Sequence, residues 1–263
     1  MLLARSGLLP AFVQAGHQVI AIFDLGPLEL IAAMLAAVAG AVVQGSIGFG
    51  MGLVLVPVLA IVAPAALPVT VVLLGMPVNI LMSLREWPSI DRHGFAWIVA
   101  GRTAGTVLGV WLLLVVAGAS LSVLFGVVIV AAVVTSIVSP TLRIRGRSLV
   151  IAGAISGVFA TTAAIGGPPL ALLYQHRPGP ELRSTLAVTF GVGGLMTLAG
   201  LHVTGQTRLE QVVLALLLGI AVLVGLAISR RVARRLDARW LRPAVLTFAA
   251  VSGLYAVLRG LNG

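Results

Sequence analysis

Two glycine-rich stretches hold the residues best suited to bind a ligand in this chain. The first is GFGMG at residues 48–52 and the second is IGGPP at residues 165–169, about 117 residues further on. Each follows an apolar run and therefore interrupts a hydrophobic segment. Helix breakers at corresponding positions in two halves of a membrane protein indicate a binding site near the middle of the bilayer.

The chemistry that these breaks predict is anion binding through backbone amides. Backbone that leaves helical geometry in hydrocarbon persists only where protein or a wet cavity satisfies its polar groups. Glycine permits unusual dihedral angles and close approach of a ligand, and proline suits the first turn of a new helix. The free N–H groups of such a helix attract an anion. The residues expected here are Gly48, Gly50, Gly52, Gly166, Gly167, Pro168 and Pro169. The alternative is that the glycines only allow helices to cross closely.

Polar side chains precede both breaks. Gln44 and Ser46 come before the first, and Ser156, Thr161 and Thr162 before the second. They could donate hydrogen bonds to an oxyanion. The alternative for the hydroxyl groups is a bond to a carbonyl of their own helix.

Asn79 and Arg102 lie deep in apolar segments. Asn79 either joins two helices by a hydrogen bond or binds the ligand. Arg102 is the one charge well inside a span, where insertion costs about 2.5–3.5 kcal/mol. Either its long side chain returns the guanidinium to the interface, or the guanidinium meets an anion.

The acidic residues, histidines and cysteines limit the other chemistry. All seven acidic residues lie in the tail, in loops or at span ends, which argues against a carrier of metal ions. The chain has no cysteine, and we expect no metal site and no cofactor. His176 and His202 could couple transport to a proton, or could simply be interfacial residues.

The elements that position these residues are apolar helices. Hydrophobic residues make up 60% of the chain and charged residues 9%, which predicts an integral membrane protein. The fold class is all-α, a polytopic membrane helix bundle. Segments 49–63 and 168–176 are too short for a full span and predict half-helices or re-entrant helices. The ten apolar segments are 28–46, 49–63, 67–84, 95–116, 120–139, 149–165, 168–176, 184–203, 211–229 and 240–258.

Close helix packing is predicted along one of these segments. Gly101, Gly105 and Gly109 are spaced by four residues and so share one helix face. Small residues allow helices in lipid to approach closely.

The domain organisation follows from counting five segments in each half. The odd number predicts two inverted repeats, the second entering the membrane from the opposite side. We expect an N-terminal tail or surface helix at 1–27, a first repeat at 28–140, a connector at 141–148 and a second repeat at 149–258.

The arginines give the predicted orientation. The net charge of +10 comes from arginine, without any lysine. With each segment crossing, thirteen arginines fall on one face and three on the other, so the Arg-rich loops are expected in the cytoplasm. This distribution also argues for a topological signal and against nucleic-acid binding.

The chain resembles the sulfite exporter TauE/SafE family, also called the toluene-sulfonate uptake permease family. The resemblance rests on GSIGFGMGLVLVPVLA at 45–60 and GAISGVFATTAAIGGPPLALLY at 153–174. It implies a bacterial membrane permease that moves sulfite, sulfonates or other small organic anions without using ATP.

We therefore expect a secondary carrier for a small anion that works by alternating access in the bacterial inner membrane. The expected partners are the anion, the lipid bilayer, a possible coupling ion or proton and a possible second copy of the chain. One alternative is an intramembrane enzyme with Ser46 as nucleophile and His202 as base. Another is a channel or a passive subunit of a membrane complex.

Overall fold

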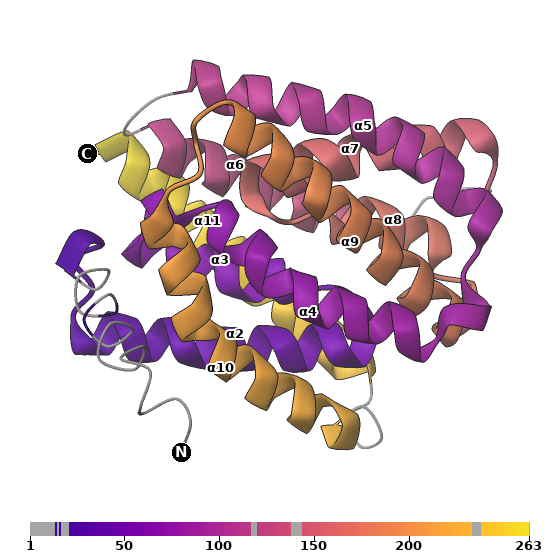
Figure 1. Cartoon of the computed structure of the whole chain (residues 1–263), viewed down its shortest axis with the longest axis horizontal. Coiled ribbons are helices and arrows are strands. Elements are labelled where there is room, and N and C mark those ends of the chain that lie inside the picture. The colour runs from indigo at the N-terminus through magenta and orange to yellow at the C-terminus, as the bar shows by residue number, and fades with distance from the viewer. Residues whose placement is uncertain are drawn as a thin grey trace.

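The computed structural model describes residues 14, 16, 21–116, 120–137, 144–232 and 238–262. Within these ranges the chain is helical and has no strand, so the predicted all-α bundle is confirmed (Figure 1). The ten helices match the ten predicted segments. They are α2 (Pro27–Ile47), α3 (Met51–Val62), α4 (Val69–Arg85), α5 (Arg92–Val115), α6 (Ser120–Ile137), α7 (Gly146–Ala163), α8 (Gly167–Tyr174), α9 (Gly179–Val203), α10 (Leu209–Val232) and α11 (Ala238–Asn262).

The surface of the bundle is that of an integral membrane protein. Five helices are long and apolar enough to cross a bilayer: α2, α5, α7, α9 and residues 209–229 of α10. On α5, the large apolar side chains of Val107, Trp111 and Leu114 are exposed. The glycines of the same helix are buried. Apolar side chains outside and small residues inside suit a helix surrounded by lipid.

The glycine face of α5 packs along α7, as the spacing predicted. A side chain at Gly101 would collide with the Val150 carbonyl, and one at Gly105 with the Ala154 carbonyl. In return, a Cβ at Gly157 of α7 would lie 2.6 Å from the Arg102 carbonyl oxygen. This close approach brings the middle of α5, with Arg102, directly against α7.

The helices pair in a regular pattern. α5 packs along α7, and α10 packs along α2; α4 packs on α9, and α6 on α11. Exchanging the first five helices for the last five reproduces the same pairs. The two short helices α3 and α8 each follow and contact the long helix before them, α2 and α7.

The predicted N-terminal tail and the predicted connector lie partly outside the described residues. Residues 1–27 lie mostly outside the described part of the chain, as do 141–143 of the expected connector. The rest of that connector is shorter than expected, because α7 begins at Gly146. The Ser148 hydroxyl accepts a hydrogen bond from the Arg145 N–H at 3.0 Å and so caps this helix start.

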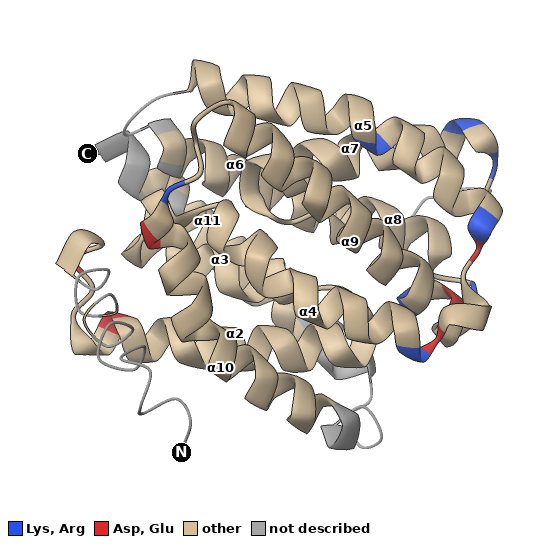
Figure 2. Ribbon diagram, in the orientation of Figure 1, with Lys and Arg blue, Asp and Glu red and all other residues tan. Residues whose placement is uncertain are grey.

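Most of the described arginines gather at one end of the bundle, whereas the opposite end carries fewer charged residues (Figure 2). This Arg-rich end holds the end of α4 and the starts of α5, α7 and α9. Arg183 on α9 makes two hydrogen bonds to Glu86 after α4, of 2.6 and 3.2 Å. The Asp91 N–H before α5 donates to the Thr185 hydroxyl on α9 at 3.0 Å. These contacts join α4 and α5 to α9.

Candidate functional site

The first break lies between α2 and α3. α2 ends at Gly48, which has a φ of 103°, and its N–H closes the helix on the Gln44 carbonyl at 2.8 Å. Gly50 precedes α3 and has a φ of 113°. Both values fall in the region that favours glycine, so the two glycines allow the chain to turn between helices.

The second break, between α7 and α8, uses different residues from those expected. The positive φ, 56°, belongs to Ala164, whereas Gly166 has a φ of −81°. The prediction that Gly166 and Gly167 supply unusual dihedral angles is therefore wrong, as it is for Gly52 of the first break. They supply space: a Cβ on Gly166 would lie 3.0 Å from the Ser156 Oγ, and one on Gly167 would lie 2.9 Å from the Phe49 ring.

The two breaks meet inside the bundle. Phe49 of the first lies on Gly167 of the second, and a side chain at Gly52 would collide with the Ala164 carbonyl. The two turns also correspond in the chain, because Gly48 and Ala164 end the long helices, and Gly50 and Gly166 precede the short ones.

A cavity of about 70 Å³ lies at this junction. By the same measure one water molecule needs roughly 10–15 Å³, so a small oxyanion fits. Its walls come from α2, α3, α4, α5, α7, α8 and α9. The predicted residues that line it are Gln44, Gly50, Gly52, Asn79, Arg102, Gly166, Gly167 and Pro168.

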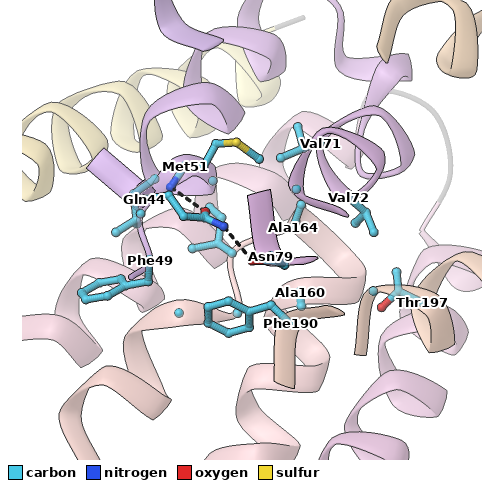
Figure 3. A pocket seen from close by; sticks show the side chains of 18 of the residues that line it. Gln44, Phe49, Met51, Val71, Val72, Asn79, Ala160, Ala164, Phe190 and Thr197 are labelled. Atoms are coloured by element: carbon cyan, nitrogen blue, oxygen red, sulfur yellow. Dashed lines mark hydrogen bonds between the residues drawn. The ribbon is translucent and has the colours of Figure 1, made fainter. Parts of the chain in front are cut away.

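Gln44 joins three helices at one side of the cavity (Figure 3). Its Nε2 donates to the Asn79 Oδ1 at 2.9 Å, and its Oε1 accepts from the Met51 N–H at 3.3 Å. Asn79 thus both links helices and lines the cavity. The two amide side chains are buried and held in one orientation, with polar atoms beside the cavity.

Arg102 also lines the cavity and does not reach the interface. It is 2% exposed, and its Nη1 donates to the Ser156 hydroxyl at 2.9 Å. Its Cζ lies 5.6 Å from the centre of the Phe190 ring. The alternative in which this side chain extends to the membrane surface is therefore wrong.

Ser156 connects the guanidinium to the second break. Its hydroxyl donates to the Gly166 carbonyl at 2.7 Å while it accepts from Arg102. The side chain of a buried arginine keeps its charge, so this relay holds a positive charge beside the start of α8.

Some backbone groups at the helix ends around the cavity already have partners. One carbonyl near the end of α2 and two near the end of α7 accept hydrogen bonds: Gln44 O from Gly48, Ala160 O from Ala164, and Phe159 O from Ile165. Pro168 and Pro169 carry no N–H, so α8 offers fewer donors than expected. The first N–H of α3, on Met51, is engaged by Gln44. Gly52 on α3 and Gly167 on α8 line the cavity at these helix starts, where the first N–H groups have no partner within the helix.

Five predicted residues lie outside the cavity wall. Gly48 packs on Arg183: a Cβ added at Gly48 would lie 2.8 Å from the Arg183 Cγ. Pro169 follows Pro168, which does line the cavity. The Thr162 hydroxyl bonds to the Val158 carbonyl of its own helix at 2.7 Å. Thr161 reaches the cavity only through the lining residue Thr197, 3.0 Å away between hydroxyl oxygens. The Ser46 hydroxyl is buried without a partner among the described residues.

The histidines suggested for proton coupling also lie apart from this cavity. His176 and His202 are both exposed and do not line it.

Sequence reasoning missed several wall residues. Phe49 was noted only as part of its motif, and Phe190 and Thr197 not at all. Spacing offered one signal: Phe190, Gly194 and Thr197 share one face of α9, as Val71, Gly75 and Asn79 share one face of α4.

An apolar helical bundle with a cavity between two interrupted helices, lined by apolar side chains and by the polar groups of Gln44, Asn79, Arg102 and Thr197, is typical of a membrane protein that handles a small polar solute. The sequence matches the family described as Sulfite exporter TauE/SafE over residues 32–256. The chain therefore belongs to this family of membrane transporters, and the prediction that it is not an enzyme is confirmed. No curated protein and no solved structure matches the chain.

Proposed function

We propose that the chain is a secondary carrier for a small oxyanion such as sulfite or a small sulfonate. The observation that carries this proposal is Arg102, a buried positive charge beside a cavity that fits such an anion. Membership of the sulfite exporter family supports the substrate class.

The anion binds between Arg102 and the starts of α3 and α8. The guanidinium supplies charge-assisted hydrogen bonds, and the amide side chains of Asn79 and Gln44 form another part of the cavity wall. Phe49 and Phe190 supply apolar walls, which suit the non-oxygen face of a sulfite or the substituent of a sulfonate.

Alternating access arises from two inverted repeats that move relative to one another. The pairing of α5 with α7 and of α10 with α2 supports this, since exchange of the two halves maps one pair onto the other. The substrate binds where the two helix breaks meet, at the interface between the two repeats. The protein lies in the bacterial inner membrane with its Arg-rich end in the cytoplasm, because loops rich in arginine stay on the cytoplasmic side.

Uptake into proteoliposomes tests this function. The purified chain is reconstituted, and accumulation of labelled sulfite, methanesulfonate and acetate is measured at pH 7. We expect saturable uptake of at least one of these anions. Failure of all three to enter faster than into protein-free vesicles contradicts the proposal.

A matched pair of variants locates the site. Arg102→Gln removes the buried charge and should lower uptake at least tenfold. Arg92→Gln removes an exposed arginine from the same helix and should leave uptake unchanged. Equal uptake by both variants would place the anion elsewhere.

A further inference from the structure

Arg102 has no negative partner within the described part of the chain. Its Nη1 donates to a neutral hydroxyl, on Ser156, and its Nε is buried without any hydrogen-bond partner among the described residues. The guanidinium also packs against Gly193, where it fills the space that a side chain would need. Helix α9 therefore covers the guanidinium closely.

The described carboxylates are engaged or placed elsewhere. Glu86 pairs with Arg183 and Glu181 with Arg177, while Asp91 accepts hydrogen bonds from Tyr174 and the Gly94 N–H. No described residue that lines the cavity is acidic. The charge of Arg102 is consequently balanced only by an anion that enters the cavity.

We infer that this carrier is an anion exchanger, which changes its orientation readily with an anion bound and slowly when empty. This inference rests on the proposed function and adds its mode of operation: one anion leaves as another enters.

The physical reason is the desolvation of Arg102 in the closed intermediate. Alternating access requires a state in which the cavity is shut on both sides. In that state water no longer screens the guanidinium, and an unpaired buried charge is strongly unfavourable. A bound anion neutralises the charge, so the loaded carrier passes this state with a lower barrier.

The structure also prevents Arg102 from leaving the cavity when it is empty. Ser156 ties the guanidinium to the Gly166 carbonyl, and the glycine contacts between α5 and α7 hold the backbone of Arg102 against α7. Arg102 lies ten residues into α5, roughly 15 Å from its first residue at 1.5 Å per residue, which is beyond the reach of its side chain to the helix start. The charge therefore stays at the site in every state that preserves this packing.

The test compares exchange with net uptake in the same proteoliposomes. Entry of labelled sulfite, methanesulfonate or acetate is followed into vesicles loaded with the same unlabelled anion and into vesicles loaded with gluconate, which is too large for the cavity. Equal potassium on both sides with valinomycin holds the membrane potential at zero, so that charge accumulation cannot limit net uptake. Sulfite is handled without oxygen.

We expect exchange to exceed net uptake at least tenfold, a difference of about 1.4 kcal/mol in barrier height. Arg92→Gln should keep this ratio. Arg102→Gln should bring it close to one in whatever transport remains. Equal rates of exchange and net uptake by the wild-type chain overturn the inference and leave the proposed function intact. If no anion enters under either condition, the proposed function itself fails.

Discussion

At the scale of single residues, the account depends on the hydrogen-bonded relay from Arg102 through Ser156 to the Gly166 carbonyl. The relay fixes a positive charge where the second helix break begins. Neighbouring hydroxyls on α7 have other partners: that of Thr162 bonds within its own helix. The two hydroxyls therefore allow a direct comparison.

We predict that Ser156→Ala weakens sulfite binding about tenfold, because Arg102 loses the acceptor that orients it. Hydrogen bonds to charged groups contribute roughly 1.5–3 kcal/mol, enough for an effect of this size. Binding is measured by the shift in melting temperature of the purified protein across sulfite concentrations. Thr162→Ala removes a hydroxyl from the same helix and should change the dissociation constant less than twofold. A similar loss of sulfite affinity in both variants would show that the hydrogen bond from Arg102 to Ser156 does not contribute to binding.

Ala164 permits a second prediction at this scale. Its φ of 56° costs an L-residue about 1–2 kcal/mol, and glycine avoids this cost while losing about 0.5–1 kcal/mol in unfolded-state entropy. Ala164→Gly should therefore raise the melting temperature slightly, by about 1–3 °C. Ala163→Gly, one residue earlier and at the last position of α7, should lower it. A decrease in both variants would contradict the strained conformation of Ala164.

At the scale of elements, the site is the meeting of two helix breaks. Sequence spacing predicted all ten helices, the two short ones included, since glycine and proline interrupt apolar runs whatever the tertiary fold. It also predicted the contact face of α5, where Gly101 and Gly105 follow helical periodicity. What it could not predict was which residues turn inward from α9. Phe190 and Thr197 share one face of α9, but the sequence does not mark that face as the inward one until α9 is placed against α4 and α5.

The backbone at the second break shows the same limit. The GGPP sequence suggested that glycine supplies the turn, yet Ala164 supplies it and the glycines make room for Phe49 and Ser156. A motif indicates that a helix ends, whereas the packing of neighbouring helices decides which residue takes the positive φ.

A single added methyl group at Gly52 should separate the two helix breaks. Gly52→Ala places a Cβ against the Ala164 carbonyl, so α3 must move away from the second break. Overpacking of this kind costs about 1–3 kcal/mol, and we expect a lower melting temperature together with impaired uptake. Gly219→Ala in α10 meets no atom within 4 Å and should stabilise the helix by about 0.5–1 kcal/mol. If Gly52→Ala were as harmless as Gly219→Ala, the breaks would not need their close contact.

At the scale of the whole molecule, arginines mark one end of the bundle, and that end carries the contacts between α4, α5 and α9. The sequence predicted this distribution because charged residues avoid the hydrocarbon region. The orientation that we propose follows from the same distribution.

The absence of cysteine makes this orientation easy to measure. Arg147→Cys replaces an exposed residue at the start of α7, at the Arg-rich end. Leu209→Cys replaces an exposed residue at the start of α10, at the opposite end, shortly after α9 ends. In intact bacterial spheroplasts, a membrane-impermeant maleimide should label Leu209→Cys and should label Arg147→Cys only after permeabilisation. The reverse pattern would place the Arg-rich end outside.

The central claim is that a small oxyanion sits beside Arg102 where the two helix breaks meet. Selenite is a close analogue of sulfite and can be located by its anomalous X-ray scattering in crystals of the protein. The account predicts one selenium peak in the cavity, placed so that a selenite oxygen accepts a hydrogen bond from the Arg102 guanidinium; this peak disappears in Arg102→Gln and persists in Arg92→Gln. Selenium bound only at the Arg-rich loops, or a cavity peak unaffected by Arg102→Gln, would contradict it.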